Sequence, residues 1–173
     1  MTIALYDISV ATYQQTLGAL AGVMDRALKH FAEKNIDAES VVDTRLFPDM
    51  LPFRFQVQSV AHHSLGTIEA LKSGAFHAPD GSPAHDYRSL QKLIADTQDA
   101  LAKVTPAEVN ALEGRDVTFH LRDFKLPFTA EKFVLSFSLP NFYFHATTAY
   151  DILRTKGVPL GKRDFMGQMR MKM

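Results

Sequence analysis

Apolar side chains recur along four long segments of the chain at alternating steps of three and four residues. This spacing places them on one face of an α-helix, so each segment is predicted to be an amphipathic helix that packs against a core. Four such helices in one chain are typical of a helix bundle. The predicted helices run from Ser9 to Lys34, from about Pro52 to Lys72, from Tyr87 to Leu101, and from Thr129 to Lys156.

Residues that start and stop helices support these boundaries. Thr105 and Glu108 have the capping-box spacing, which predicts a short additional helix after the third long one. Gly157 supplies the left-handed position that commonly ends a helix. Between the second and third helices, the sequence GAFHAPDGSPAHD (residues 74–86) is rich in Gly, Pro and Asp, so we predict a loop there.

Two stretches show the alternation of a β-strand. Val117, Phe119 and Leu121 alternate with polar residues, which predicts a short extended arm rather than a sheet. In Phe133–Leu139 the same alternation competes with helical spacing that continues downstream. A helix that is kinked or restarted at Pro140 is our preferred interpretation of this stretch, and a strand is the alternative.

These patterns together predict an all-α fold, an up-down four-helix bundle with a short extended β-like arm over Val117–Leu121. No repeat, low-complexity tract or linker interrupts the chain, so residues 1–173 are predicted to form a single domain. A chain of 173 residues is long enough to bury a core without disulfide bonds.

Composition and charge narrow the classes of function. Lys+Arg and Asp+Glu both number 19, so the chain lacks the basic excess that a nucleic-acid-binding protein usually carries. No apolar run approaches the ~20 residues that span a bilayer, and the first residues do not have the pattern of a signal peptide. Cysteine is absent, which excludes thiolate chemistry. We therefore expect a cytoplasmic protein without nucleic-acid or membrane partners.

Two sequence stretches resemble a known family. The segments FPDMLPFRFQVQ and LPNFYFHATTAYDILRTKGVPLGKRDFMG resemble an uncharacterised bacterial family of domains of unknown function. That family is grouped with the DinB/YfiT-like four-helix bundles, and the resemblance covers nearly the whole chain. It implies a DinB-like fold and a homodimer. Many members of the superfamily bind a divalent metal through one histidine on the second helix and two on the fourth, and some are thiol transferases or hydrolases.

The histidines of this chain match that metal site only in part. His145 is the only histidine of the fourth helix, and its i+4 neighbour, which would lie on the same face, is Ala149. Asn141, at i−4, is a weak ligand through its amide oxygen. The second helix offers His63 and, as second choice, His62. If a metal binds to these residues, zinc, nickel or iron suits imidazole and oxygen ligands.

Two hypotheses of function follow from these residues. The first, which we prefer, is a small-ligand-binding or structural protein without a cofactor, in which unknown small molecules enter a pocket between the helices. The second is a divalent-metal-dependent thiol transferase or hydrolase with a degenerate histidine site. For His145 itself, a partly buried histidine that is hydrogen-bonded within the core is the interpretation we prefer, and a metal or ligand contact is the alternative. The predicted pocket is lined by His63, Asn141, Tyr143, His145 and Tyr150.

Overall fold

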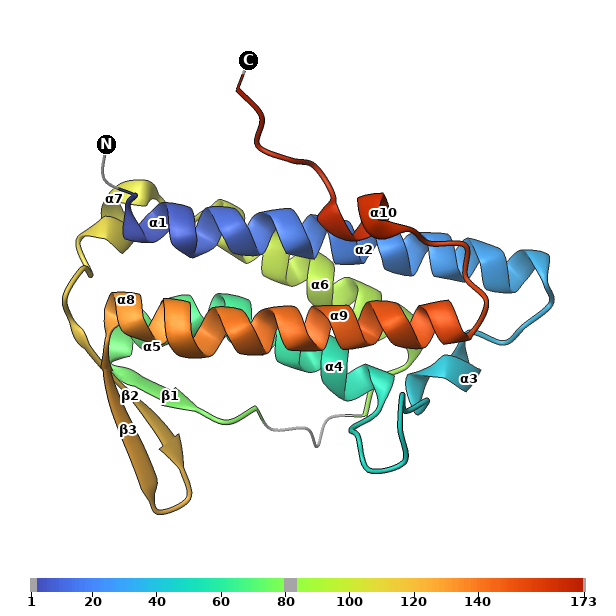
Figure 1. The fold of residues 1–173 in the computed structure, drawn as a ribbon, viewed down its shortest axis with the longest axis horizontal. Coiled ribbons are helices and arrows are strands. Elements are labelled where there is room, and N and C mark those ends of the chain that lie inside the picture. The colour runs from blue at the N-terminus through green and yellow to red at the C-terminus, as the bar shows by residue number, and fades with distance from the viewer. Residues whose placement is uncertain (1–2, 80–83, 173) are drawn as a thin grey trace.

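The computed structural model describes residues 3–79 and 84–172, and its four long helical segments form a bundle (Figure 1). Two of these segments contain an internal π-helical stretch, denoted η. The long helical segments are α2 (Val10–Glu33), α4–η1–α5 (Phe53–Ala61, His62–Gly66 and Thr67–Ser73), α6 (Tyr87–Ala102) and α8–η2–α9 (Ala130–Phe133, Val134–Ser138 and Leu139–Thr155). The short helices are α1 (Leu5–Ile8), α3 (Glu39–Val42), α7 (Pro106–Asn110) and α10 (Lys162–Met166).

The direction of the long helices differs from the simple up-down order that the sequence suggested. In Figure 1, α2 and α9 run from left to right, whereas α4–η1–α5 and α6 both run from right to left. The second and third long helices are therefore parallel, and the chain crosses the length of the bundle between them. Part of this connection, residues 80–83 of the predicted loop, lies outside the described residues.

The all-α prediction is corrected by a three-stranded sheet at one end of the bundle. Its strands are β1 (Ala75–His77), β2 (Asp116–Leu121) and β3 (Phe124–Thr129), in the order β1-β2-β3. β1 pairs in parallel with β2, whereas β2 and β3 form an antiparallel hairpin. The predicted arm is thus the central strand of a sheet, and the first residues of the predicted loop form its first strand.

The stretch Phe133–Leu139 is helical, so the strand alternative is wrong. Its π-helical part ends at Ser138, and Pro140 occupies the first turn of α9. Ser138, the residue before α9, is itself helical (φ −65°, ψ −53°), so the proline lies within a continuous helical segment and removes a backbone hydrogen bond there. We predicted that the helix is kinked or restarted at Pro140. The irregularity is instead the π-helical turn η2, which directly precedes α9.

Most predicted helix ends are present, with one difference. Thr105 and Glu108 form the capping box of α7, and Gly157 has the left-handed φ of 85° after α9. Ser9 precedes α2 as predicted, but its hydroxyl donates to the carbonyl oxygen of Leu5 and does not cap the helix. In the described part of the chain, no helix is both long enough and apolar enough to cross a membrane.

Candidate functional site

The π-helical turn η1 directs two neighbouring histidines to different surroundings. The His63 side chain is buried, with only 3% of its surface exposed, and it faces α9. The His62 ring is nearly perpendicular to it, at an interplanar angle of 84°, and lines a groove on the side of α6. The chain therefore separates the two histidines that the sequence offered as alternatives, and His63 is the one beside His145.

His63 and His145 form a stacked pair across the contact between η1 and α9. Their ring centroids are 5.8 Å apart and their planes differ by 18°. The side chains around the pair are aromatic: Phe76 and Phe137 lie against His63, while Phe55 and Phe144 present their edges to His145 (ring centroids at 5.3 to 5.9 Å). In this pair the His63 ring is buried in the core, whereas the His145 ring is partly exposed to solvent.

Gln56 fixes the proton on the His145 ring. Its side-chain nitrogen donates to the carbonyl oxygen of Leu51 at 2.7 Å, which leaves its Oε1 atom as an acceptor. The Nδ1 atom of His145 lies 2.8 Å from that Oε1, so Nδ1 must carry the hydrogen and donate it. The Nε2 atom of the neutral ring then keeps a lone pair. Partners of this kind orient histidines that bind ligands or metals.

Both rings are neutral at physiological pH because burial disfavours the imidazolium form. Burial, together with the neighbouring His145 and His62, lowers the pKa of His63 to about 3. Burial also lowers the pKa of His145 to about 4. Two neutral imidazoles side by side can accept hydrogen bonds or bind metals, but neither is a proton donor at neutral pH.

One buried polar atom of the pair has no hydrogen-bond partner among the described residues. The Nδ1 atom of His63 is buried and unpaired. A buried polar atom without a partner costs about 1–3 kcal/mol, and such atoms are uncommon in native proteins. An apolar ring of the same shape at this position would remove this cost.

A buried hydroxyl network holds the backbone of η1 in place. The hydroxyl groups of Ser138 and Thr67 both donate to the carbonyl oxygen of His63, at 2.7 and 2.9 Å. Because the Ser138 hydrogen is already used, the Tyr13 hydroxyl, 2.7 Å away, is the donor to Ser138. Burial raises the pKa of Tyr13 further above its ordinary value, so it remains protonated. The network connects α2, η1 and η2 and aims the His63 side chain at α9.

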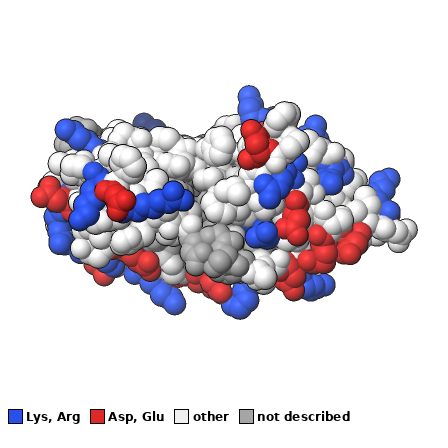
Figure 2. Space-filling view, turned by 90° about the horizontal axis from the view of Figure 1, so that it is seen from below, with Lys and Arg blue, Asp and Glu red and all other residues white. Residues whose placement is uncertain are grey.

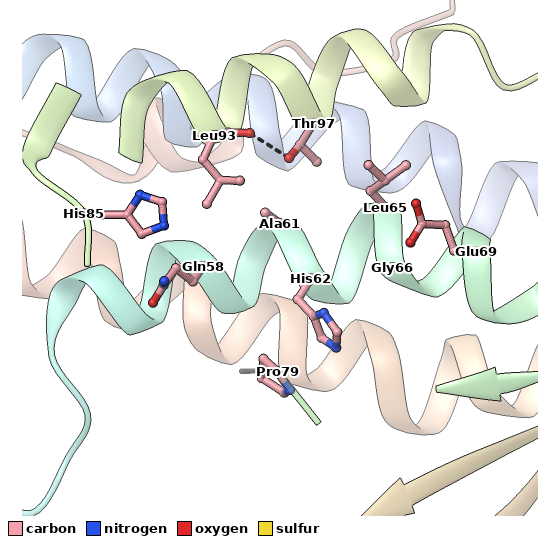
Figure 3. A pocket seen from close by; sticks show the side chains of 10 residues that line it. All are labelled: Gln58, Ala61, His62, Leu65, Gly66, Glu69, Pro79, His85, Leu93 and Thr97. Carbon is pink, nitrogen blue, oxygen red and sulfur yellow. Dashed lines mark hydrogen bonds between the residues drawn. The ribbon is translucent and has the colours of Figure 1, made fainter. Parts of the chain in front are cut away.

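On the other side of η1, a groove of about 310 Å³ lies between this segment and α6 (Figure 3). Its apolar floor includes Ala61, Leu65 and Leu93, and its polar side chains include His62, Glu69, His85 and Thr97. In Figure 3 the Thr97 hydroxyl donates to the Leu93 carbonyl oxygen.

Three polar groups of this groove have partners within the protein. The Nε2 atom of His62 lies 2.7 Å from the carbonyl oxygen of His77, and Nδ1 of His85 lies 3.2 Å from the Ser89 hydroxyl. Burial lowers the pKa of His62 as well. Because His62, His85 and Thr97 are satisfied by the chain itself, the groove is a weaker candidate for a ligand site than the His63–His145 pair.

The other residues of the predicted pocket have contacts of their own. The Asn141 amide donates to the carbonyl oxygen of Phe137 on its own helix. The Tyr143 ring packs against Phe142, and the Tyr150 ring packs against Phe165 of α10. Of the predicted pocket residues, His63 and His145 are in contact with each other. Sequence reasoning missed Gln56, the hydrogen-bond partner of His145, because it had no recognisable signal in the chain.

The residues around the pair do not fit the three-histidine metal site of the superfamily. Ala149 is completely buried in the core, so the position of a second α9 ligand is occupied by packing. The described residues include no group of three or more His, Asp or Glu side chains that are placed to hold a metal ion. A metal at this place would therefore have two imidazole ligands from the protein at most.

Comparisons with known proteins agree with this fold and with the predicted resemblance. Residues 5–166 match a family that is described as a domain of unknown function, DUF1993. No curated protein matches the chain. Among solved structures, the crystal structure of a DinB family member protein from Shewanella denitrificans is similar, with 27% sequence identity and a TM-score of 0.79. The match covers 98% of this chain and 95% of that one. The chain therefore belongs to the DUF1993 family of domains of unknown function.

Proposed function

We propose that the protein binds a small molecule at the His63–His145 pair and that it does so without a metal. The observation that carries this proposal is the hydrogen-bond chain from Leu51 through Gln56 to His145. This chain leaves the Nε2 lone pair of a half-buried, neutral imidazole as an acceptor beside aromatic side chains. Such a combination of apolar walls and a few oriented polar atoms is typical of small-molecule sites.

The surroundings define the chemistry of the ligand. The contacts of the two rings are with aromatic side chains and the neutral Gln56 amide. Among the residues that the structure describes, no carboxylate, ammonium or guanidinium group contributes to the pKa shifts of either histidine. A site without a counter-charge disfavours an ionic ligand, because the cost of removing the ion from water is not repaid. The ligand is therefore a neutral molecule with an apolar ring or chain and one hydrogen-bond donor.

A metal-dependent transferase or hydrolase is less well supported by the same residues. Neutral imidazoles from opposite helices are suitable ligands, and the Gln56 contact resembles the partner that orients a metal-bound histidine. However, Ala149 fills the position of the third ligand, and catalytic zinc sites ordinarily have three protein ligands. Elemental analysis of untagged protein for zinc, nickel and iron separates the two hypotheses. A stoichiometric metal that is lost in His145→Phe contradicts the metal-free proposal.

Phenol and anisole form a matched pair of probes for the site. Both have an aromatic ring, but only phenol has a hydroxyl hydrogen to donate to Nε2 of His145. We expect phenol to shift the ring resonances of His63 and His145 in a saturable NMR titration, and anisole to shift them much less. In His145→Phe, which keeps a ring at this position, the phenol response of His63 disappears.

A variant of the groove is the control for this experiment. His85→Phe alters the groove in Figure 3 and leaves the stacked pair intact. It retains the phenol response if the ligand binds at His145. Equal responses to phenol and anisole, or a response that is lost in His85→Phe and kept in His145→Phe, contradict the proposal.

A further inference from the structure

Two histidines lie side by side on the outer face of the three-stranded sheet. In the pairing of β1 with β2, His77 stands opposite His120. Phe76 and Phe119, one position earlier in each strand, are buried in the core, so the alternation of a strand directs both histidines to the opposite face. The two ring centroids are 5.0 Å apart and the ring planes differ by 23°. The sheet thus brings together two imidazoles from distant parts of the sequence.

The ring nitrogens of both histidines are available to a ligand. The His77 side chain is exposed and the His120 side chain is half-buried. In the part of the chain that the structure describes, neither ring has a hydrogen-bond partner. The rings of His62, His85 and His145, in contrast, each have one. The pair on the sheet is therefore not used to satisfy polar groups of the fold.

The strands hold the backbone of the pair in place. β2 is the central strand, with β1 on one side and β3 on the other. The carbonyl oxygen of His77 accepts a hydrogen bond from Nε2 of His62, at 2.7 Å, which ties β1 to η1. Ligand atoms on such a fixed platform lose little conformational freedom on binding, so less of the binding free energy is spent on ordering them.

The spacing of the two rings fits a shared metal ion. An imidazole nitrogen binds a transition metal at about 2.0–2.1 Å, which places the metal about 3.2 Å from the ring centre. At the roughly 90–110° between ligands in square-planar or tetrahedral coordination, two ring centres are then about 4.5–5.2 Å apart. The distance between His77 and His120 lies within this range. Rotation about the Cβ–Cγ bonds turns the lone pairs toward a common point and leaves the ring centres almost in place.

The buried pair of His63 and His145 does not have this spacing. Its ring centroids are 5.8 Å apart, which corresponds to an angle of about 130° at a shared metal. Nδ1 of His145 is also bonded to Gln56 already. On the outer face of the sheet, water can complete the coordination shell of an ion, whereas aromatic side chains surround His63. The pair on the sheet shares no residue with the helix histidines to which the family resemblance points.

We propose that His77 and His120 together bind one divalent transition-metal ion, and that they bind Cu²⁺ most tightly. Imidazole nitrogens suit copper, nickel and zinc, and a given set of ligands ordinarily binds copper most strongly of the three. Water molecules occupy the remaining coordination positions. Mg²⁺ and Ca²⁺ do not bind there, because they require oxygen ligands.

The imidazoles, and not a field of charge, select the ion. At the end of the molecule that carries the sheet, on the left in both views, Figure 2 shows blue and red side chains intermixed and no continuous acidic field. Lys125 stands opposite His120 on the same outer face, and its ammonium group opposes a bound cation. Lys125→Gln should therefore tighten Cu²⁺ binding by about 3-fold or more, and weaker binding in this variant contradicts the site.

Calorimetric titration of the untagged full chain with Cu²⁺ at pH 7.5 tests the site. We expect one ion per chain to bind saturably. His77→Thr and His120→Thr each leave one imidazole, so either should weaken binding by about 100-fold, because the second ligand no longer acts at a high effective concentration. Threonine suits a partly exposed strand position, and circular dichroism without metal checks that each variant keeps its fold.

Two histidines outside the sheet provide the controls. His145→Phe disrupts the buried pair, and His30→Gln removes a histidine of α2 whose ring lies beside Phe31. Both variants should bind Cu²⁺ like the wild type. Zn²⁺, which is suited to NMR, should shift the ring signals of His77 and His120 together, whereas Mg²⁺ should shift neither.

Three results overturn the proposal. The first is the absence of saturable Cu²⁺ binding, and the second is an affinity that either His77→Thr or His120→Thr leaves unchanged. The third is an affinity that is lost in His145→Phe, which would assign the ion to the buried pair. Binding that both threonine variants weaken, and that His145→Phe and His30→Gln do not, supports the site on the sheet.

Discussion

Acidification should destabilise the protein through the two buried imidazoles. The pKa of His63 is about 3 in the folded protein, against 6.5 in the unfolded chain, and the pKa of His145 is about 4. Between these values and 6.5, the unfolded chain binds protons that the folded protein does not. The stability from each neutral ring is therefore fully present above pH 6.5 and decreases as the pH falls toward 4 and then 3.

The loss of stability at a given pH follows from how far that pH lies below the pKa of histidine in the unfolded chain. A full proton difference changes the free energy of unfolding by about 1.4 kcal/mol per pH unit. At pH 5, which is 1.5 units below the unfolded pKa of 6.5, the buried His63 alone accounts for a loss of about 2 kcal/mol. His145 adds a smaller amount, because water screens its half-exposed ring.

Urea unfolding at pH 7.5 and pH 5, monitored by circular dichroism, measures this difference. His63→Phe is the informative variant, because phenylalanine keeps an aromatic ring beside Phe76 and Phe137 but cannot bind a proton. Between the two pH values we expect His63→Phe to lose about 2 kcal/mol less stability than the wild type. Its stability at pH 7.5 should be equal or higher, because the unpaired Nδ1 atom is removed.

A destabilised variant without a titrating group is the control. Ser138→Ala breaks the hydroxyl network but leaves both imidazoles, so its loss between pH 7.5 and 5 should equal that of the wild type. Hydrogen bonds from backbone amides lower the pKa values of the carboxyl groups of Asp86 and Glu108, so these groups titrate below this range. If His63→Phe and the wild type lose the same stability, the buried neutral state of His63 is refuted.

Three further outcomes test other parts of the structure. Ser138→Ala should lower the free energy of unfolding at pH 7.5 by about 1–3 kcal/mol, because the His63 carbonyl and the Tyr13 hydroxyl each lose a buried partner; urea unfolding measures this. Gly66→Ala should shift the NMR signals of the His62 ring, because the added Cβ atom would lie 3.4 Å from its Nδ1 atom. Thr105→Ala should cost about 1 kcal/mol in thermal or urea unfolding through loss of the α7 cap.

The long helices were predictable because each carries its signal along its own segment. The stripe of α2 and the capping box at Thr105 depend on residues within a few positions of one another. The resemblance through the PNFYFH and GVPLGK segments added the DinB-like grouping, which the structural neighbour supports. The pattern did not predict the crossover between α5 and α6, because hydrophobic periodicity contains no information on the direction of a helix.

The sheet was missed because its evidence is not local. β1 has only three residues, and it is a strand because its backbone pairs with β2 more than 40 positions later, with Ala75 opposite Thr118. In β3, Pro127 argues against a strand, although it is acceptable at an outer edge. The π-helical turn η1 was equally invisible, because the hydroxyl of Ser138, which bonds the His63 carbonyl oxygen in that turn, lies 75 positions away in the sequence.

The candidate site was predicted only in part. His63 and His145 were identified as a pair from helical spacing and the resemblance, and the structure brings them together. Gln56 lies 89 positions from His145 in the sequence, and a glutamine near the start of an amphipathic helix is unremarkable without its partner. The rings of Tyr143 and Tyr150, which were also predicted to line the pocket, pack against Phe142 and against Phe165 of α10.

The tautomer of His145 tests the central claim most directly, and nitrogen-15 NMR of the histidine rings at neutral pH measures it. The hydrogen-bond chain through Gln56 predicts a neutral ring with its hydrogen on Nδ1 and a lone pair on Nε2. Gln56→Leu should abolish this preference, while the His85→Phe control should retain it. A His145 ring that carries its hydrogen on Nε2 in the wild type, or that is protonated at neutral pH, would contradict the proposed acceptor.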